Sequence, residues 1–187
     1  MAAYRHLLGE WSARMNLVGP SALEAFWLRH AYDSAQLLTH APEALRWMDV
    51  GSGAGLPGLV LAILARDRPG MTVQLVESAA KKSAFLEAVV ERLNLPAKVH
   101  RARIEDLPGP APQVLTARAV APLARLLGYT EKHLRSGATG VFLKGRNVEH
   151  EIAEALQSWR FDYALSQSLS DPEGRILRIW SVRRASA

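Results

Sequence analysis

Residues 49–58 read DVGSGAGLPG, and this segment decides the fold class. It follows the short apolar run 47–50 and precedes an apolar stretch over 59–66 that has helical character. Four glycines in the eight residues 51–58 allow positive φ values and a close approach of a ligand to the backbone. The helix that follows leaves its first N–H groups free. The segment therefore predicts a cofactor-binding turn in an open α/β sheet, where ligands bind beyond the carboxyl ends of the strands.

Short apolar strands and helices alternate along the rest of the chain, which is typical of βαβ units with a parallel sheet. Strands are expected over 47–50, 72–76, 98–100, 114–117 and 141–143, and helices over 59–66, 81–93, 122–134 and 149–156. The tail breaks this rhythm, because strands over 163–169 and 175–182 are joined by a short turn at 171–174. We therefore predict a mostly parallel sheet that ends in an antiparallel hairpin.

The first forty residues indicate helices that cover the sheet. One apolar face is formed at helical spacing by Tyr4, Leu7, Leu8, Trp11 and Met15. A capping box at Ser21–Glu24 predicts the start of a second helix, and a third is expected over 32–40. We expect an N-terminal helical cap over 1–45 and a Rossmann-like domain over 46–187.

Composition excludes several classes of protein. The 187 residues contain no cysteine, which excludes disulfide scaffolds and thiolate zinc sites, and we expect no metal. No stretch approaches the roughly 20 apolar residues that a membrane-spanning helix needs, and the N-terminus does not resemble a signal peptide. We therefore expect a cytoplasmic protein without a membrane partner. The net charge of +5 is compatible with a polyanionic partner.

The spacing of the glycines fits two kinds of cofactor. Gly51, Gly53 and Gly55 form G-x-G-x-G, whereas Gly53, Gly55 and Gly58 also satisfy the dinucleotide pattern G-x-G-x-x-G. In a dinucleotide fingerprint the first glycine follows the strand directly. Gly51 holds that place here, and a register that starts from it fails because position 56 is leucine.

Two carboxylates refine the choice of cofactor. Asp49 lies inside the expected strand and would meet a cationic ligand such as S-adenosylmethionine better than a diphosphate; alternatively, N–H groups of the loop satisfy it. Glu77 ends the next strand and can accept the ribose hydroxyls of an adenosine, which both NAD and S-adenosylmethionine carry. Ile104 and Glu105 follow the third strand, where they would contact an adenine.

Read together, the motifs resemble one family closely, the RsmG (GidB) methyltransferases, which methylate N7 of a guanine in 16S rRNA. The resemblance covers nearly the whole chain. The matching segments are Trp11 with MNLV at 15–18, RH at 29–30 with DS at 33–34, DVGSGAGLPG at 49–58, LVES at 75–78, KK at 81–82, FL at 85–86, RIE at 103–105, RAVAPL at 118–123 and LKG at 143–145.

The resemblance implies a class I methyltransferase sheet with S-adenosylmethionine as the cofactor. It places the cofactor against Gly51, Leu56, Ile104, Glu105 and Arg118, and the residues themselves add Asp49, Gly53 and Glu77. For the RNA we expect Arg118 and Lys144 to clamp the guanine edge, with His30, Asp33 and Arg175 as further contacts. The partner would be 16S rRNA or the small ribosomal subunit, and the protein would act as a monomer.

Catalysis should need no general base. Guanine N7 carries a lone pair and no proton, so the expected contribution of the protein is alignment of the reacting groups. Three other functions stay open: an NAD-dependent oxidoreductase, a non-catalytic RNA-binding module of the same fold, and methylation of a small molecule or a protein.

Overall fold

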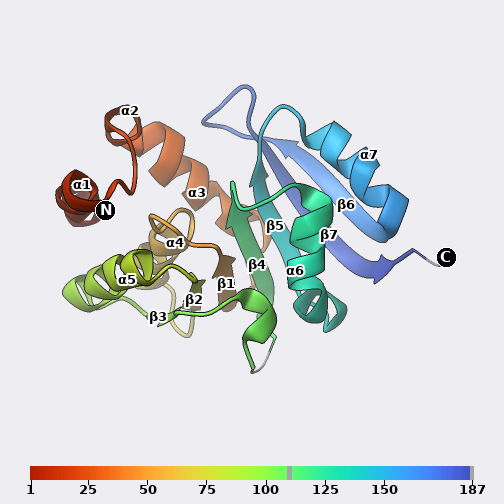
Figure 1. The fold of residues 1–187 in the computed structure, drawn as a ribbon, viewed down its shortest axis with the longest axis horizontal. Helices are drawn as coiled ribbons and strands as arrows, with labels where there is room; N and C mark the ends of the chain where they lie inside the picture. The colour runs from red at the N-terminus through yellow and green to blue at the C-terminus, as the bar shows by residue number, and fades with distance from the viewer. Residues whose placement is uncertain (109–110, 186–187) are drawn as a thin grey trace.

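A computed structural model describes residues 1–108 and 111–185. Its centre is a seven-stranded sheet of order β3-β2-β1-β4-β5-β7-β6 (Figure 1). The strands are β1 (Arg46–Val50), β2 (Thr72–Val76), β3 (Ala97–His100), β4 (Val114–Arg118), β5 (Thr139–Lys144), β6 (Trp159–Gln167) and β7 (Arg175–Arg184). The first five strands run parallel, and β7 pairs antiparallel with both β5 and β6. The mostly parallel sheet with a terminal hairpin is thus confirmed.

One face of the sheet is covered by the N-terminal helices together with α4 (Gly58–Ala65) and α5 (Ala80–Leu93). Alternate strand residues such as Trp47 and Val73 point to this side. Tyr4 and Leu8 of α1 (Ala2–Met15) are fully buried in the same core. The N-terminal helices therefore share one hydrophobic core with the sheet.

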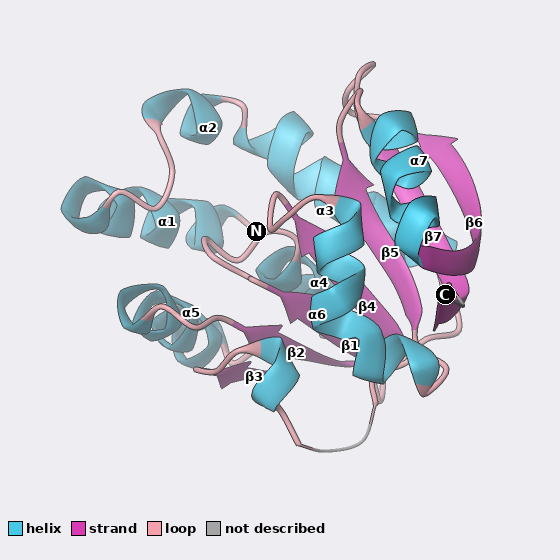
Figure 2. Ribbon diagram, turned by 45° about the vertical axis from the view of Figure 1, so that its right-hand side comes forward, coloured by secondary structure: helices cyan, strands magenta, loops and turns pink. Residues whose placement is uncertain are grey.

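The opposite face is covered by α6 (Leu123–Arg135), α7 (Val148–Ser158) and the short 3-10 turn η3 (Ile104–Asp106). Figure 2 shows α6 and α7 lying across the strands on this side. Met48 and Val50 face these helices, whereas their neighbours in the strand face α4. Burial on both faces explains why the central parallel strands β1, β4 and β5 are nearly continuous apolar runs.

The N-terminal segment differs from expectation at two helix starts. The short helix α2 (Pro20–Glu24) has Gly19 as its N-cap, and no side chain caps it. The capping box predicted for Ser21 is therefore wrong, because Pro20 lacks an N–H and its fixed φ suits the first helical position. The helix expected over 32–40 begins earlier, at Phe26. It consists of three consecutive parts, the π-helix η1 (Phe26–Tyr32), the α-helix α3 (Asp33–Ala35) and the 3-10 helix η2 (Gln36–His40). Trp27 and Leu28 of η1 are more than half exposed, so the apolar pattern did not reveal it.

The first strand of the hairpin, β6, begins four residues earlier than expected and ends at Gln167, before Leu169. Trp159 opens β6 as a buried residue, with its indole N–H donating to the Ala124 carbonyl at 3.2 Å. Leu169, expected in a strand, lies in the connecting loop with 72% of its surface exposed. Among the described residues, no helix is both long and apolar enough to cross a membrane.

Strand order fixes where a ligand can bind. Successive strands extend from β1 toward β3 in one direction and from β4 toward β5 in the other, so the order reverses between β1 and β4. Val50 pairs with Ala117 in the register of these two strands. The glycine-rich loop after β1 and the segment after β4 thus leave the sheet side by side, at the switch point where ligands of open α/β sheets bind.

Candidate functional site

The glycine-rich loop requires glycine at Gly51 for two reasons. Its φ is +65°, in the left-handed region that side chains rarely adopt. A Cβ at this position would lie 2.8 Å from Cγ2 of Val120, which follows β4. The loop is therefore packed closely against the segment after β4, and only a residue without a side chain fits at the junction.

Asp49 lies beneath the loop rather than in contact with a ligand. It is 1% exposed, and its Oδ2 accepts a hydrogen bond from the Gly58 N–H at 3.1 Å. Its Oδ1 accepts one from the Thr116 hydroxyl at 2.8 Å, and its carbonyl accepts one from the Ser52 hydroxyl at 3.0 Å. Partners in the loop and Thr116 thus satisfy the carboxylate, as in the alternative expectation, and its direct contact with a cationic ligand stays a prediction.

Burial raises the pKa of Asp49 from 3.8 to about 6, although the hydrogen bonds from Thr116, Ser52 and Gly58 oppose the shift. Because the folded state binds this proton more tightly than the unfolded state, the stability contributed by Asp49 is fully present below pH 4. It is lost as the pH rises through about 6.

We predict that Asp49→Asn removes this pH dependence. The asparagine oxygen can accept from Gly58, and its amide can donate to Thr116, so the loop keeps its contacts. Chemical denaturation of both proteins at pH 4 and pH 7 measures the effect. From pH 4 to pH 7, the free energy of unfolding of the variant should rise relative to that of wild type by an amount on the order of 3 kcal/mol. A wild type that loses stability relative to the variant on acidification would contradict the structural role.

Glu77 holds the glycine-rich loop from the next strand. It is 8% exposed, its Oε2 accepts from the Gly53 N–H at 3.0 Å, and its Oε1 accepts from the Ala79 N–H at 2.8 Å. Each carboxylate oxygen can accept two hydrogen bonds, so Glu77 keeps acceptor capacity beyond these two contacts. The geometry is compatible with the expected ribose hydroxyls.

The remaining residues expected at the cofactor surround the same strand ends. Ile104 is 5% exposed and packs in one cluster with Val50 and Val76, while Glu105 beside it is exposed. Leu56 is 4% exposed and packs into the core on the opposite face. Its side chain is therefore buried in the core, and the expected contact of its backbone with the cofactor stays a prediction.

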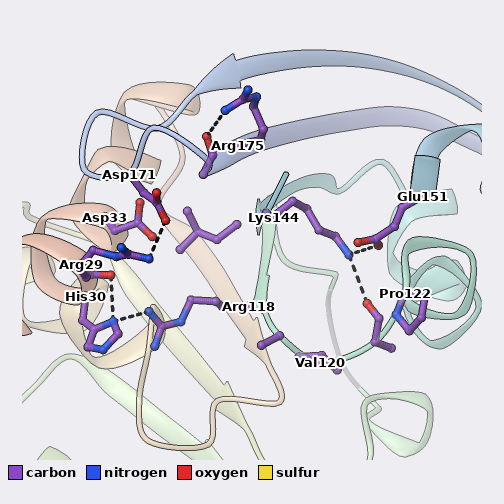
Figure 3. Close-up of a pocket in the computed structure, with 15 residues that line it drawn as sticks. Arg29, His30, Asp33, Arg118, Val120, Pro122, Lys144, Glu151, Asp171 and Arg175 are labelled. Atoms are coloured by element: carbon purple, nitrogen blue, oxygen red, sulfur yellow. Dashed lines mark hydrogen bonds and ion pairs between the residues drawn. The ribbon is translucent and has the colours of Figure 1, made fainter. Parts of the chain in front are cut away.

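A cavity of about 520 Å³ opens beyond the ends of β4 and β5, between these strands, η1 and the loop that joins β6 to β7 (Figure 3). All five side chains expected to contact RNA line it: His30, Asp33, Arg118, Lys144 and Arg175. Val120 lines it as well and also packs on Gly51, so the cavity adjoins the glycine-rich loop. A cavity of this size is in the range that accommodates small ligands, and it has room for a nucleobase.

Arg118 ends β4 and points toward η1. Its Nη1 lies 2.8 Å from Nδ1 of His30, and among the described residues it forms no ion pair with a carboxylate. Burial lowers its pKa, yet an arginine remains charged at neutral pH. Ala119 next to it has a φ of +54°, which turns the chain sharply after the strand. A guanidinium held by a neutral imidazole keeps its full charge for an acceptor in the cavity.

The charged groups of Lys144 and Arg175 already have hydrogen-bond partners within the protein. The Lys144 ammonium contacts Oε2 of Glu151 at 2.7 Å and donates to the Ala121 carbonyl, so it points away from Arg118 (Figure 3). Arg175 donates to the carbonyls of Pro172 and Gly174 in its own turn. Both residues line the cavity, but in this structure their charged groups bind neighbouring residues of the cavity wall.

Asp33 anchors the loop between β6 and β7. Its Oδ1 accepts hydrogen bonds from Gln36 at 2.8 Å, from Ser168 at 2.7 Å and from Ser170 at 2.6 Å. Arg29 reinforces this connection by an ion pair with Asp171 at 2.8 Å. The carboxylate thus joins segments about 135 residues apart, and its expected contact with RNA stays a prediction.

Sequence reasoning missed three residues that shape the site. Val120 and Glu151 line the cavity, and Tyr4 donates its hydroxyl to the Ala54 carbonyl at 2.7 Å, which ties α1 to the glycine-rich loop. Tyr4 is fully buried, and burial raises its pKa far above the ordinary value. Its position on an apolar helix face gave no signal of this long-range contact.

Comparison with known proteins agrees with this architecture. The model of the GidB family, described as rRNA small subunit methyltransferase G, matches residues 1–176. The ribosomal RNA small subunit methyltransferase G of Caulobacter vibrioides is 50% identical over 184 residues, which cover 98% of this chain and 85% of the relative. The protein of the same name from Brucella anthropi is 44% identical over 189 residues, covering 100% of this chain and 89% of the relative.

Solved structures share the fold at low identity. The ribosomal protein L11 methylase of Lactobacillus delbrueckii subsp. bulgaricus has a TM-score of 0.61 at 18% identity, covering 82% of this chain and 77% of that one. A mutant of MtNAS in complex with S-adenosylmethionine has a TM-score of 0.60 at 17% identity, covering 94% and 72%. With the family match over most of its length, the chain belongs to the GidB family: it is a methyltransferase with the class I fold, and S-adenosylmethionine is its cofactor.

Proposed function

We propose that the protein methylates N7 of a guanine in 16S ribosomal RNA. The observation that carries the proposal is the cavity at the ends of β4 and β5, because it gathers the five side chains expected at the RNA and adjoins the glycine-rich loop. The names of the relatives, which specify small-subunit ribosomal RNA, support the same substrate.

The residues around the loop fit an adenosyl cofactor. We infer that Gly51, Gly53 and Leu56 meet the cofactor through their backbone, and Glu77 has acceptor capacity for the ribose. We infer that Ile104 and Glu105 border the adenine and that Arg118 lies where the cofactor and the base meet. When bound, S-adenosylmethionine supplies an electrophilic methyl group on a sulfonium.

The protein contributes position rather than proton transfer. N7 of guanine has a lone pair in the ring plane, whereas O6 beside it can accept a hydrogen bond from an arginine. We infer that Arg118 donates to O6 and thereby aims N7, and that Val120 and Pro122 limit how the base enters the cavity. Alignment of this kind can lower a barrier by roughly 7 to 11 kcal/mol. Because N7 carries no proton, no side chain is needed as a general base.

The rival functions have less support. A hydride-transferring enzyme would need a dinucleotide at the loop, and the family to which the chain belongs consists of methyltransferases. A non-catalytic RNA-binding module has no support from the relatives, which are named as methyltransferases. We also propose that residues 1–45 cap the sheet as part of a single unit, and that the protein acts as a monomer in the cytoplasm.

Transfer of a labelled methyl group tests the substrate. Small subunits and 16S rRNA that lack the modification are incubated with S-adenosylmethionine labelled in its methyl group. We expect label in the RNA, and ribonuclease should remove it from the precipitable fraction. Label that resists ribonuclease but yields to protease would replace the RNA by a protein substrate, and no incorporation into either form of the RNA would reject the proposal.

A further inference from the structure

His30 places one nitrogen between two groups that make opposite demands on it. Its Nδ1 lies 2.8 Å from Nη1 of Arg118, which can only donate, and 2.9 Å from the Arg29 carbonyl, which can only accept. A nitrogen of a neutral imidazole is either a donor or an acceptor. Nδ1 therefore serves Arg118 when the ring carries its proton on Nε2, and it serves Arg29 when the proton is on Nδ1.

We propose that His30 is a positioning residue for Arg118, which its Nδ1 lone pair holds at the cavity until a ligand takes over the guanidinium. The inference rests on the function proposed above, because it assigns Arg118 to the RNA base.

Each arrangement gives Nδ1 one hydrogen-bond partner, which is what a releasable contact requires. With the proton on Nε2, His30 gains a hydrogen bond from a charged donor, but that N–H is buried and has no partner among the described residues. With the proton on Nδ1, the ring donates to the Arg29 carbonyl, and only a buried lone pair stays unpartnered. Arg118 can therefore leave for an acceptor in the cavity without stranding Nδ1.

Burial and the charges around the ring keep His30 neutral at physiological pH. Burial lowers its pKa most, the guanidinium groups of Arg118 and Arg29 lower it as well, and the hydrogen bond to the Arg29 carbonyl raises it. Asp33 on the same helical segment also raises this pKa, and Asp171 of the loop after β6 neutralises Arg29 through their ion pair. Protonation in acid converts Nδ1 into a donor. It then bonds only to the Arg29 carbonyl, and the imidazolium repels Arg118.

The proton position can be measured directly. Nitrogen NMR of the imidazole distinguishes a protonated from an unprotonated ring nitrogen, and loss of a signal in His30→Asn assigns the residue among six histidines. We expect the proton on Nε2 in the wild type and on Nδ1 in Arg118→Ala. A wild-type ring protonated on Nδ1 would overturn the proposal, and so would a proton that stays on Nε2 in Arg118→Ala.

Kinetics test the role in transfer. In single-turnover methylation of unmodified small subunits, His30→Phe should lower the rate about 10- to 100-fold, equivalent to one charged hydrogen bond, without altering S-adenosylmethionine affinity. His30→Asn should retain most of the wild-type rate, because its side-chain oxygen can accept a hydrogen bond from Arg118. The wild-type rate should fall in acid as His30 is protonated, whereas the rate of His30→Asn should not show this fall. The exposed His150, paired with Glu154, gives the control His150→Phe, which should behave as wild type.

A double variant separates positioning from general damage. Since His30 acts through Arg118, His30→Phe should have no further effect in an Arg118→Ala background. Independent, multiplicative losses would overturn the inference, as would equal losses in His30→Phe and His30→Asn. A wild type that transfers no methyl group to the RNA would instead reject the proposed function, while the NMR result would still decide the contact between His30 and Arg118.

Discussion

Gly51→Val is expected to abolish measurable S-adenosylmethionine binding. The new side chain would enter the space where backbone and cofactor approach each other, and its Cβ alone would lie 2.8 Å from Val120. The left-handed φ of +65° adds strain of about 1–2 kcal/mol. Isothermal titration calorimetry with S-adenosylmethionine measures the loss, and thermal unfolding reports the accompanying change in stability.

Two further variants distinguish loss of the cofactor contact at Gly51 from backbone strain and from the clash with Val120. Gly137→Val tests strain alone, because Gly137 has a φ of +96° but no atom lies within 4 Å of the place that a Cβ would take there, so cofactor affinity should stay at the wild-type value. Gly51→Ala combined with Val120→Ala removes the contact with Val120, and binding should still be weakened. Wild-type affinity in Gly51→Val would place the cofactor elsewhere.

Arg118→Ala should reduce methyl transfer about 100-fold while the protein stays folded. The guanidinium contacts one neutral imidazole, so its loss should cost only about 1 kcal/mol of stability. Its hydrogen bond to the base is worth more, because it fixes N7 relative to the methyl group. Single-turnover rates measure the loss of methyl transfer, and thermal midpoints of the same preparation measure the change in stability.

A second substitution distinguishes the charge of Arg118 from the planar arrangement of its hydrogen-bond donors. Arg118→Lys keeps the positive charge but loses the planar fork of donors, so an intermediate rate is expected. Arg66, exposed at the far end of α4, gives the control Arg66→Ala, whose rate should equal that of wild type. An Arg118→Ala variant that turns over normally would remove Arg118 from the site.

The sequence was sufficient for elements whose signals are local. Runs such as 72–76 and 114–118 are mostly buried in a parallel sheet, so their strands were predictable almost to the residue. The glycine-rich turn was equally clear, because three of its glycines, Gly51, Gly53 and Gly55, have positive φ values that favour glycine. The boundaries of β6 were less predictable, since its first residue is buried against α6 by a long-range contact.

The roles of the charged residues depended on contacts that no local pattern contains. Asp49 was expected at a ligand but bonds to Thr116, which is 67 residues away in the chain. Asp33 was expected at RNA but anchors Ser168 and Ser170. In each case the residue type indicated a need for polar partners, whereas only the folded chain determined which partners meet that need.

Identification of the methylated atom tests the central claim most directly. Small-subunit RNA methylated by the protein is reduced with borohydride and cleaved with aniline, a treatment that breaks the chain at 7-methylguanosine. The proposed function predicts one new cleavage site, at a guanine, that is absent when S-adenosylmethionine is omitted. Methylated RNA that is not cleaved by this treatment would contradict transfer to guanine N7.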